Sequence, residues 1–167
     1  MCQKFKHRAS CRHRPRAEPR TGDIAGAEAF YRKALNLAPA VGKWHYVLGS
    51  ALLIRGQASA ALAEMQRETD GGFRQCGLVL ALDALGRKHE ADATLAVAEH
   101  SYGDKKAYLI ALIYARRHQA DQAFAWLERG IRQRDGDMIY IKGDPMAANI
   151  VPDPRYALMM QRLHLAD

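Results

Sequence analysis

The sequence contains no apolar run of the roughly 18 residues that a membrane-spanning helix needs. Its first twenty residues also lack the apolar middle stretch of a secretory signal. These two absences predict a cytoplasmic protein with no membrane partner.

Cysteine is scarce as well, and the three cysteines do not have the spacing of a disulfide framework. Cys2 and Cys11 lie near His7 and His13, which are metal-ligating residue types, but the spacing matches no zinc pattern. Cys76 stands alone in the middle of the chain. We therefore expect no disulfide bond and no metal site.

Catalytic and cofactor motifs are also absent. Gly71-Gly72 lacks the remainder of a phosphate-binding loop, and Ser50 lacks the flanking residues of a nucleophile elbow. Asp83 has no second carboxylate with which it could form a catalytic pair. The sequence therefore predicts no catalytic residues and no cofactor, and we expect that the protein is not an enzyme.

The net charge of +7 is concentrated at the start of the chain. Residues 1–20 hold seven Lys or Arg residues and one acidic residue, Glu18, whereas the rest of the chain is close to neutral. We interpret residues 1–21 as a basic, disordered tail, because Pro15, Pro19 and the charge density oppose burial. Nucleic acid is expected to bind only non-specifically, through this tail, if at all.

What the sequence does contain is an internal repeat. Ala27, Ala61, Ala91 and Ala123 fall into register at intervals of 34, 30 and 32 residues. An aromatic or aliphatic residue or methionine follows four positions after each alanine. A turn residue precedes each by five positions, glycine in three units and His118 in the fourth. The small side chains suit the close crossing of two helices joined by a tight turn.

The preceding half of each unit has its own apolar pattern. Leu48-Gly49 with Leu52 shows i, i+1, i+4 spacing, and the later units repeat it, which predicts a second helix. Each unit then reads as helix, turn, helix. Because no unit can cover its own apolar face, we expect the units to stack.

This pattern resembles the tetratricopeptide repeat (TPR). The resemblance implies an all-α fold, a right-handed α-solenoid of about three and a half TPR helix-turn-helix units within residues 22–137. The expected units are a half repeat at 22–41 and full repeats at 42–71, 72–103 and 104–137. The sequence departs from the family pattern where Trp44 comes one residue early, where Glu68 replaces a small residue and where His118 replaces glycine.

The two ends differ from the repeats. We expect the first unit to lack its first helix, because the stretch before residue 22 contains Pro15 and Pro19. A proline inside a helix costs roughly 3 kcal/mol. We therefore expect a fragment of a longer repeat protein, a non-native start, or an Arg-rich targeting peptide. Residues 138–167 are expected to form a C-terminal capping segment. Asp153-Pro154 would begin a capping helix from about 154 to 165.

The resemblance also implies a concave groove lined by the first helix of each unit. The lysine/asparagine clamp of some family members is missing, because Tyr46 and Ser50 occupy its places. Tyr46, Phe73 and Tyr108 are expected to be partly exposed aromatic anchors. An alternative is that flanking helices or a second copy cover part of the strip. The expected groove residues are Lys43, Tyr46, Ser50, Leu53, Phe73, Cys76, Leu80, Asp83, Lys105, Tyr108, Leu112 and Arg116, with Ile54, Ala84 and Ala115 beside them.

Two functional hypotheses follow. The first is a non-catalytic protein–protein interaction scaffold that binds a peptide or partner protein in this groove, with self-association as a further possibility. The second hypothesis rests on a more specific resemblance, which is carried by residues 107–135 and 153–165. They are similar to the C-terminal TPR regions of bacterial adenylate cyclases and winged-helix regulators. On that hypothesis the chain is a regulatory or sensor remnant whose catalytic or DNA-binding domain is absent.

Overall fold

The computed structural model describes residues 24–37 and 42–165. The expected basic tail, residues 1–21, therefore lies outside the described residues. Every regular element in the described ranges is a helix, which confirms the all-α expectation. In chain order they are α1 (Ile24–Leu37), α2 (Trp44–Ile54), α3 (Ala58–Arg67), α4 (Gly71–Ala84), α5 (Lys88–Tyr102), α6 (Ala107–Arg116), α7 (Ala120–Gln133), the 3-10 helices η1 (Gly136–Tyr140) and η2 (Pro145–Ile150), and α8 (Pro154–Arg162).

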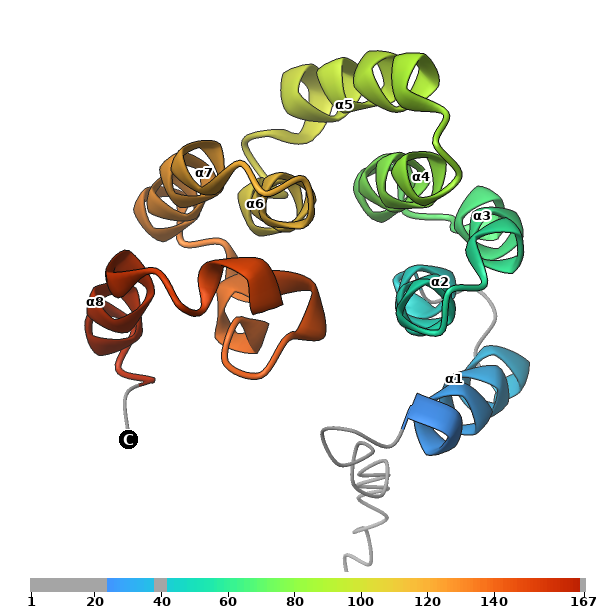
Figure 1. Ribbon diagram of the computed structural model, residues 1–167. Coiled ribbons are helices and arrows are strands. Elements are labelled where there is room, and N and C mark those ends of the chain that lie inside the picture. The colour runs from blue at the N-terminus through green and yellow to red at the C-terminus, as the bar shows by residue number, and fades with distance from the viewer. Residues whose placement is uncertain (1–23, 38–41, 166–167) are drawn as a thin grey trace, which may run out of the picture.

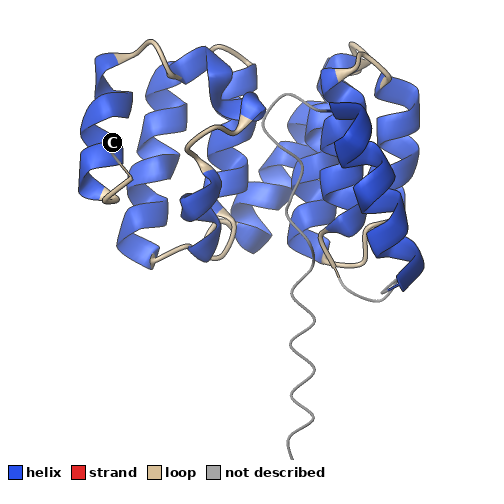
Figure 2. Ribbon diagram, turned by 90° about the horizontal axis from the view of Figure 1, so that it is seen from below, coloured by secondary structure: helices blue, strands red, loops and turns tan. Residues whose placement is uncertain are grey.

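The helices form two rows along an arc. Helices α2, α4 and α6 form the inner row, and α1, α3, α5 and α7 form the outer row (Figure 1). Successive helices pack side by side, and the inner helices also contact one another. Figure 2 shows the same helices from below, after a turn of 90° about the horizontal axis. This arrangement makes the inner row the concave side of the molecule.

The turns inside the helix pairs share one geometry. Gly56 and Gly86 have φ values of 73° and 72°, in the left-handed region that favours glycine. His118 adopts the same region, with φ of 59°. Each of the three donates its backbone N–H to the carbonyl three residues earlier. The predicted equivalence of His118 with the turn glycines thus has a structural basis.

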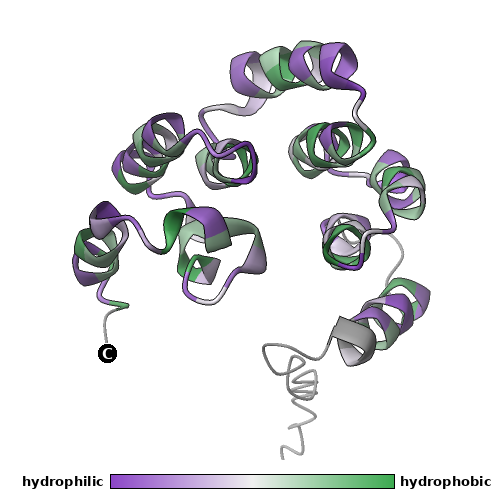
Figure 3. Ribbon diagram, in the orientation of Figure 1, coloured by the Kyte–Doolittle hydropathy of each residue, from purple (hydrophilic) through white to green (hydrophobic). Residues whose placement is uncertain are grey.

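The repeated alanines lie at close helix contacts. Ala61, Ala91 and Ala123 are fully buried, and so are Met65 and Leu127 four positions after two of them. Figure 3 shows that the α4 ribbon is mainly hydrophobic, whereas α5 mixes hydrophilic and hydrophobic residues. The outer helices therefore bury one stripe of small and medium side chains against the inner row.

Ala91→Leu is expected to destabilise the fold by roughly 1–3 kcal/mol, because extra methylenes at a fully buried crossing force strain. The measurement is chemical denaturation of the variant and of Ala125→Leu, a matched control at an exposed position of α7. Equal stability of the two variants would contradict the close crossing at residue 91.

A buried carboxylate replaces the expected small residue at position 68. The Glu68 side chain is 1% exposed. Its Oε2 accepts the backbone N–H groups of Lys43 and Tyr46 at 3.0 and 3.1 Å, and its Oε1 accepts that of Asp70 at 2.9 Å. Glu68 therefore caps the start of α2 from the end of α3, which supplies acceptors for N–H groups that have no partner inside the helix.

Asp135 caps the start of α6 in the same way, nearer the C-terminus. Its Oδ2 accepts the backbone N–H of Tyr108 at 3.0 Å, at the start of α6, from just beyond the end of α7. In the α2–α3 and α6–α7 pairs, a carboxylate that follows the second helix thus caps the first helix.

The C-terminal segment packs against the last helix pair. Helices η1 and η2 contact α6 and α7 and bury a set of apolar side chains. The predicted capping helix is present as α8, ending at Arg162, and ion pairs link its Arg155 and Arg162 to Asp121 and Glu128 of α7. Helices η1 and η2 were not predicted from the sequence. The apolar residues that they and their connection bury are Met138, Ile141, Met146, Ala147 and Ile150.

Candidate functional site

The three expected aromatic anchors lie at the starts of the inner helices, but they are buried. Tyr46, Phe73 and Tyr108 are 7%, 9% and 2% exposed, contrary to the prediction of partial exposure. The Tyr46 and Phe73 rings pack together with centroids 5.2 Å apart. The Lys106 ammonium lies 3.6 Å from the centroid of the Phe73 ring and covers it. These aromatic residues belong to the core and present no free surface to a partner.

The protein's own C-terminal segment covers this end of the concave face. The Tyr108 hydroxyl donates to Asp144 Oδ2 at 2.6 Å, between η1 and η2. Lys43 Nζ donates to the Tyr140 hydroxyl at 3.2 Å and lies 4.6 Å from the centroid of that ring. The segment thus reaches from α6 to the start of α2. This is the alternative of coverage by flanking elements that the sequence left open.

Polar groups in this covered region are shielded from solvent. Burial raises the pKa of Tyr108 and also that of Asp144 above their ordinary values. The Tyr46 hydroxyl and Ser50 Oγ are both buried. These two hydroxyls therefore face the interior.

Cys76 and Leu112 are also inaccessible, at 0% and 2% exposure. Burial raises the pKa of the Cys76 thiol to about 12, so the thiol is protonated at neutral pH. A buried, protonated thiol is neither a nucleophile nor a contact for a partner. Both residues support the core of the inner row.

At the start of α6, a lysine lies on the concave side, but it is Lys106 and not the expected Lys105. Lys105 is exposed and precedes α6, whereas its neighbour Lys106 contacts the concave side. Besides covering Phe73, the Lys106 ammonium lies 3.5 Å from Asp137 Oδ2. At the start of α6, Lys106 rather than Lys105 therefore lies on the concave side.

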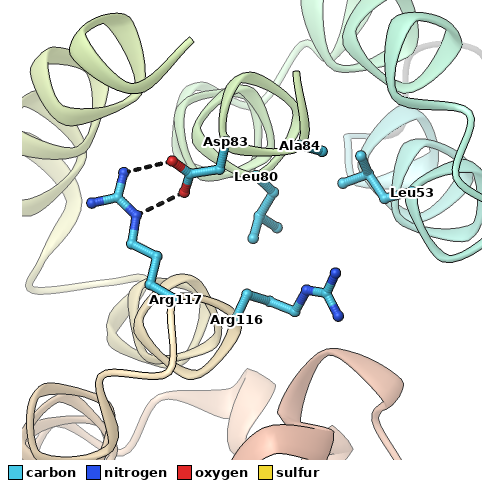
Figure 4. A pocket seen from close by; sticks show the side chains of 6 residues that line it. All are labelled: Leu53, Leu80, Asp83, Ala84, Arg116 and Arg117. Carbon is cyan, nitrogen blue, oxygen red and sulfur yellow. Dashed lines mark hydrogen bonds and ion pairs between the residues drawn. The ribbon is translucent and has the colours of Figure 1, made fainter. Parts of the chain in front are cut away.

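The opposite end of the concave face contains a pocket of about 170 Å³ (Figure 4). It lies at the C-terminal ends of α2, α4 and α6, and it brings together four of the twelve expected groove residues and one of those beside them. The lining residues are Leu53, Leu80, Asp83, Ala84, Arg116 and Arg117.

An ion pair forms one wall of this pocket. Arg117 donates from Nε and from its second terminal nitrogen to the two carboxylate oxygens of Asp83, at 2.7 and 2.9 Å. The remaining terminal nitrogen of Arg117 lies 2.8 Å from Asp92 Oδ1 of α5. This bidentate arrangement joins α4 to the end of α6 and fixes the shape of the wall.

Arg116 differs from its neighbour. Its side chain forms no hydrogen bond or ion pair within the described part of the chain, and it is exposed. In Figure 4 its guanidinium extends along the pocket away from the Arg117–Asp83 pair, on the side of Leu53. The pocket therefore combines an aliphatic surface, a carboxylate held by Arg117 and a guanidinium without a partner in the described part of the chain.

Sequence reasoning missed Arg117, Lys106 and Asp144. The first two follow groove positions by one residue, so helix periodicity alone assigned them to other faces. Asp144 lies outside the repeat register and pairs with Tyr108 across 36 residues. The one available signal was the Asp144-Pro145 pair, which is typical of a helix start.

The described residues contain no cluster of three or more metal-ligating side chains, and the tail residues Cys2, His7, Cys11 and His13 lie outside them. None of the described helices has the length and apolar character needed to cross a bilayer. Comparison with protein-family models, with curated proteins and with solved structures found no match.

Proposed function

We propose that the chain is a non-catalytic scaffold that binds a peptide or partner protein on the concave side of a TPR-like, right-handed α-solenoid. The proposal includes about three and a half helical units closed by the C-terminal segment. The binding surface is the pocket at the ends of α2, α4 and α6 and the concave surface around it.

The observation that carries the proposal is the way the pocket is built. Three successive inner helices each contribute to it at their last turn, through Leu53, Ala84 and Arg116 among others. Stacked helical units produce such composite surfaces because equivalent positions of neighbouring units lie side by side. A surface that draws on three units is suited to an extended or helical segment that runs along the row.

The size and chemistry of the pocket favour binding of a side chain. Cofactor and drug-sized sites usually occupy roughly 300–1,000 Å³, whereas this pocket measures about 170 Å³. Its one carboxylate, Asp83, is held by Arg117 in a bidentate pair and is thus committed to structure. These features support recognition of a peptide side chain rather than chemistry on a small molecule.

Leu53→Asp is expected to weaken peptide binding by about tenfold or more, because it places a second carboxylate beside the apolar floor and near Asp83. The probe is a set of peptides selected from a random phage library on the full wild-type chain. Binding is measured by fluorescence polarisation.

Val97→Asp is the matched control. Val97 is 46% exposed on the outer helix α5, so a carboxylate there should change neither folding nor binding. Circular dichroism checks that both variants keep the wild-type helical content. Peptides that bind Leu53→Asp as tightly as the wild type would contradict the proposed site.

A further inference from the structure

We propose that the pocket selects a peptide segment in which an aliphatic side chain lies next to a carboxylate. The aliphatic group would pack on Leu53 and Leu80, and the carboxylate would pair with Arg116. The inference rests on the proposed function and specifies the chemistry of the peptide that the concave side accepts.

The apolar half of the pocket determines the first part of this selectivity. Leu53 is half-buried and Leu80 is 5% exposed, so the two present aliphatic surface at the floor. An apolar cavity of roughly 150 Å³ is known to hold a single benzene ring. A pocket of about 170 Å³ therefore has room for one medium side chain, such as that of leucine or isoleucine.

The unpaired guanidinium of Arg116 determines the second part. Its neighbour Arg117 already has two carboxylate partners, Asp83 and Asp92, so Arg117 is not available to a ligand. Arg116 has no partner in the described part of the chain. A guanidinium presents a planar fork of donors that matches a carboxylate, and such charge-assisted pairs are roughly twice as strong as neutral hydrogen bonds.

The local charge balance favours a single negative charge over a phosphate group or a nucleic acid. Asp83 and Asp92 share the one guanidinium of Arg117, which leaves this wall with a net negative charge. The positive charge of Arg116 therefore offsets a field that would repel a dianion or a polyanion. With Arg116 counted, these four side chains sum to zero, so one carboxylate leaves a single excess negative charge, whereas a dianion or a polyanion leaves two or more beside Asp83.

This contact differs from the clamp of the resembled family. The clamp positions correspond to Tyr46 and Ser50, whose hydroxyls face the covered interior at the other end of the concave face. Arg116 lies at the last turn of α6, among residues from three inner helices. The carboxylate of the peptide would therefore bind at the end of the concave face that contains the pocket, away from Tyr46 and Ser50.

The test starts with random peptides selected by phage display on the full wild-type chain. We expect the selected sequences to be enriched in Asp or Glu next to Leu or Ile. A synthetic peptide from this set should bind about tenfold more tightly than the same peptide with its acidic residue changed to the amide. Arg116→Gln should abolish this preference, and Arg116→Lys should keep part of it.

Arg132→Gln is the matched control, because Arg132 is an exposed arginine of α7 with no partner among the described residues. It should leave the preference unchanged. Peptides that lose binding on Leu53→Asp but show no acidic preference, or bind better with phosphoserine in place of the acid, would overturn this inference and leave the proposed function standing. Selection of no peptide, or only of peptides insensitive to Leu53→Asp, would overturn both.

Discussion

Glu68→Ala is expected to lower the free energy of unfolding by roughly 2–4 kcal/mol, one of the two largest effects that we anticipate. The alanine leaves three backbone N–H groups, those of Lys43, Tyr46 and Asp70, without their acceptor at a nearly fully buried position. Chemical denaturation monitored by circular dichroism measures the loss.

Two further variants define the mechanism of this loss. Glu68→Gln keeps one acceptor oxygen and should fall between the wild type and Glu68→Ala. Glu90→Ala removes an exposed glutamate whose ion pair with Arg87 lies at the surface, and it should cost much less than Glu68→Ala. A Glu68→Ala effect no larger than that of Glu90→Ala would show that capping by Glu68 does not stabilise α2.

Tyr108→Ala should cost roughly 3–5 kcal/mol, because it removes a large side chain that is 2% exposed and leaves a cavity. A groove residue would instead lose partner binding and keep its stability. Urea denaturation of Tyr108→Ala and of Leu95→Ala, a core variant of α5, distinguishes these outcomes. Similar losses in the two variants indicate a core role for Tyr108, and a stable Tyr108→Ala would contradict it.

Tyr108→Phe isolates the hydrogen bond to Asp144, and its effect should depend on pH. Because burial raises the pKa of Asp144, ionisation of this carboxyl group opposes folding as pH rises through the folded-state pKa. The Tyr108 hydroxyl lowers that cost by donating to the carboxylate. The loss in Tyr108→Phe should therefore be larger at neutral pH than at pH values below the ordinary pKa of an aspartate, where Asp144 is protonated in both states.

Local spacing was sufficient to predict the helices of the repeat units and the turns inside the helix pairs. The alanine register and the residues five positions earlier predicted where the outer helices begin, and Gly56, Gly86 and His118 adopt one turn conformation. These features depend on contacts within one helix pair, so a single unit carries their signal. Glu68 looked like a departure from the pattern because its partners lie at the start of the preceding helix.

The accessible part of the concave face could not be predicted in the same way. Periodicity placed Tyr46, Phe73 and Tyr108 on the inner row, but their burial depends on η1, η2 and Lys106. Short 3-10 helices have too few residues to show a period. The pocket was partly predicted because most of its lining residues lie near the C-terminal ends of the inner helices, where helix periodicity assigned them to the concave side.

The central claim is that a peptide binds at the ends of α2, α4 and α6. Its most direct test is a titration of the isotope-labelled full chain with a phage-selected peptide, followed by amide nuclear magnetic resonance. We expect the largest chemical-shift changes to cluster at Leu53, Ala84 and Arg116. Changes that cluster instead around Val97 on the outer row, with none at the pocket, would contradict it.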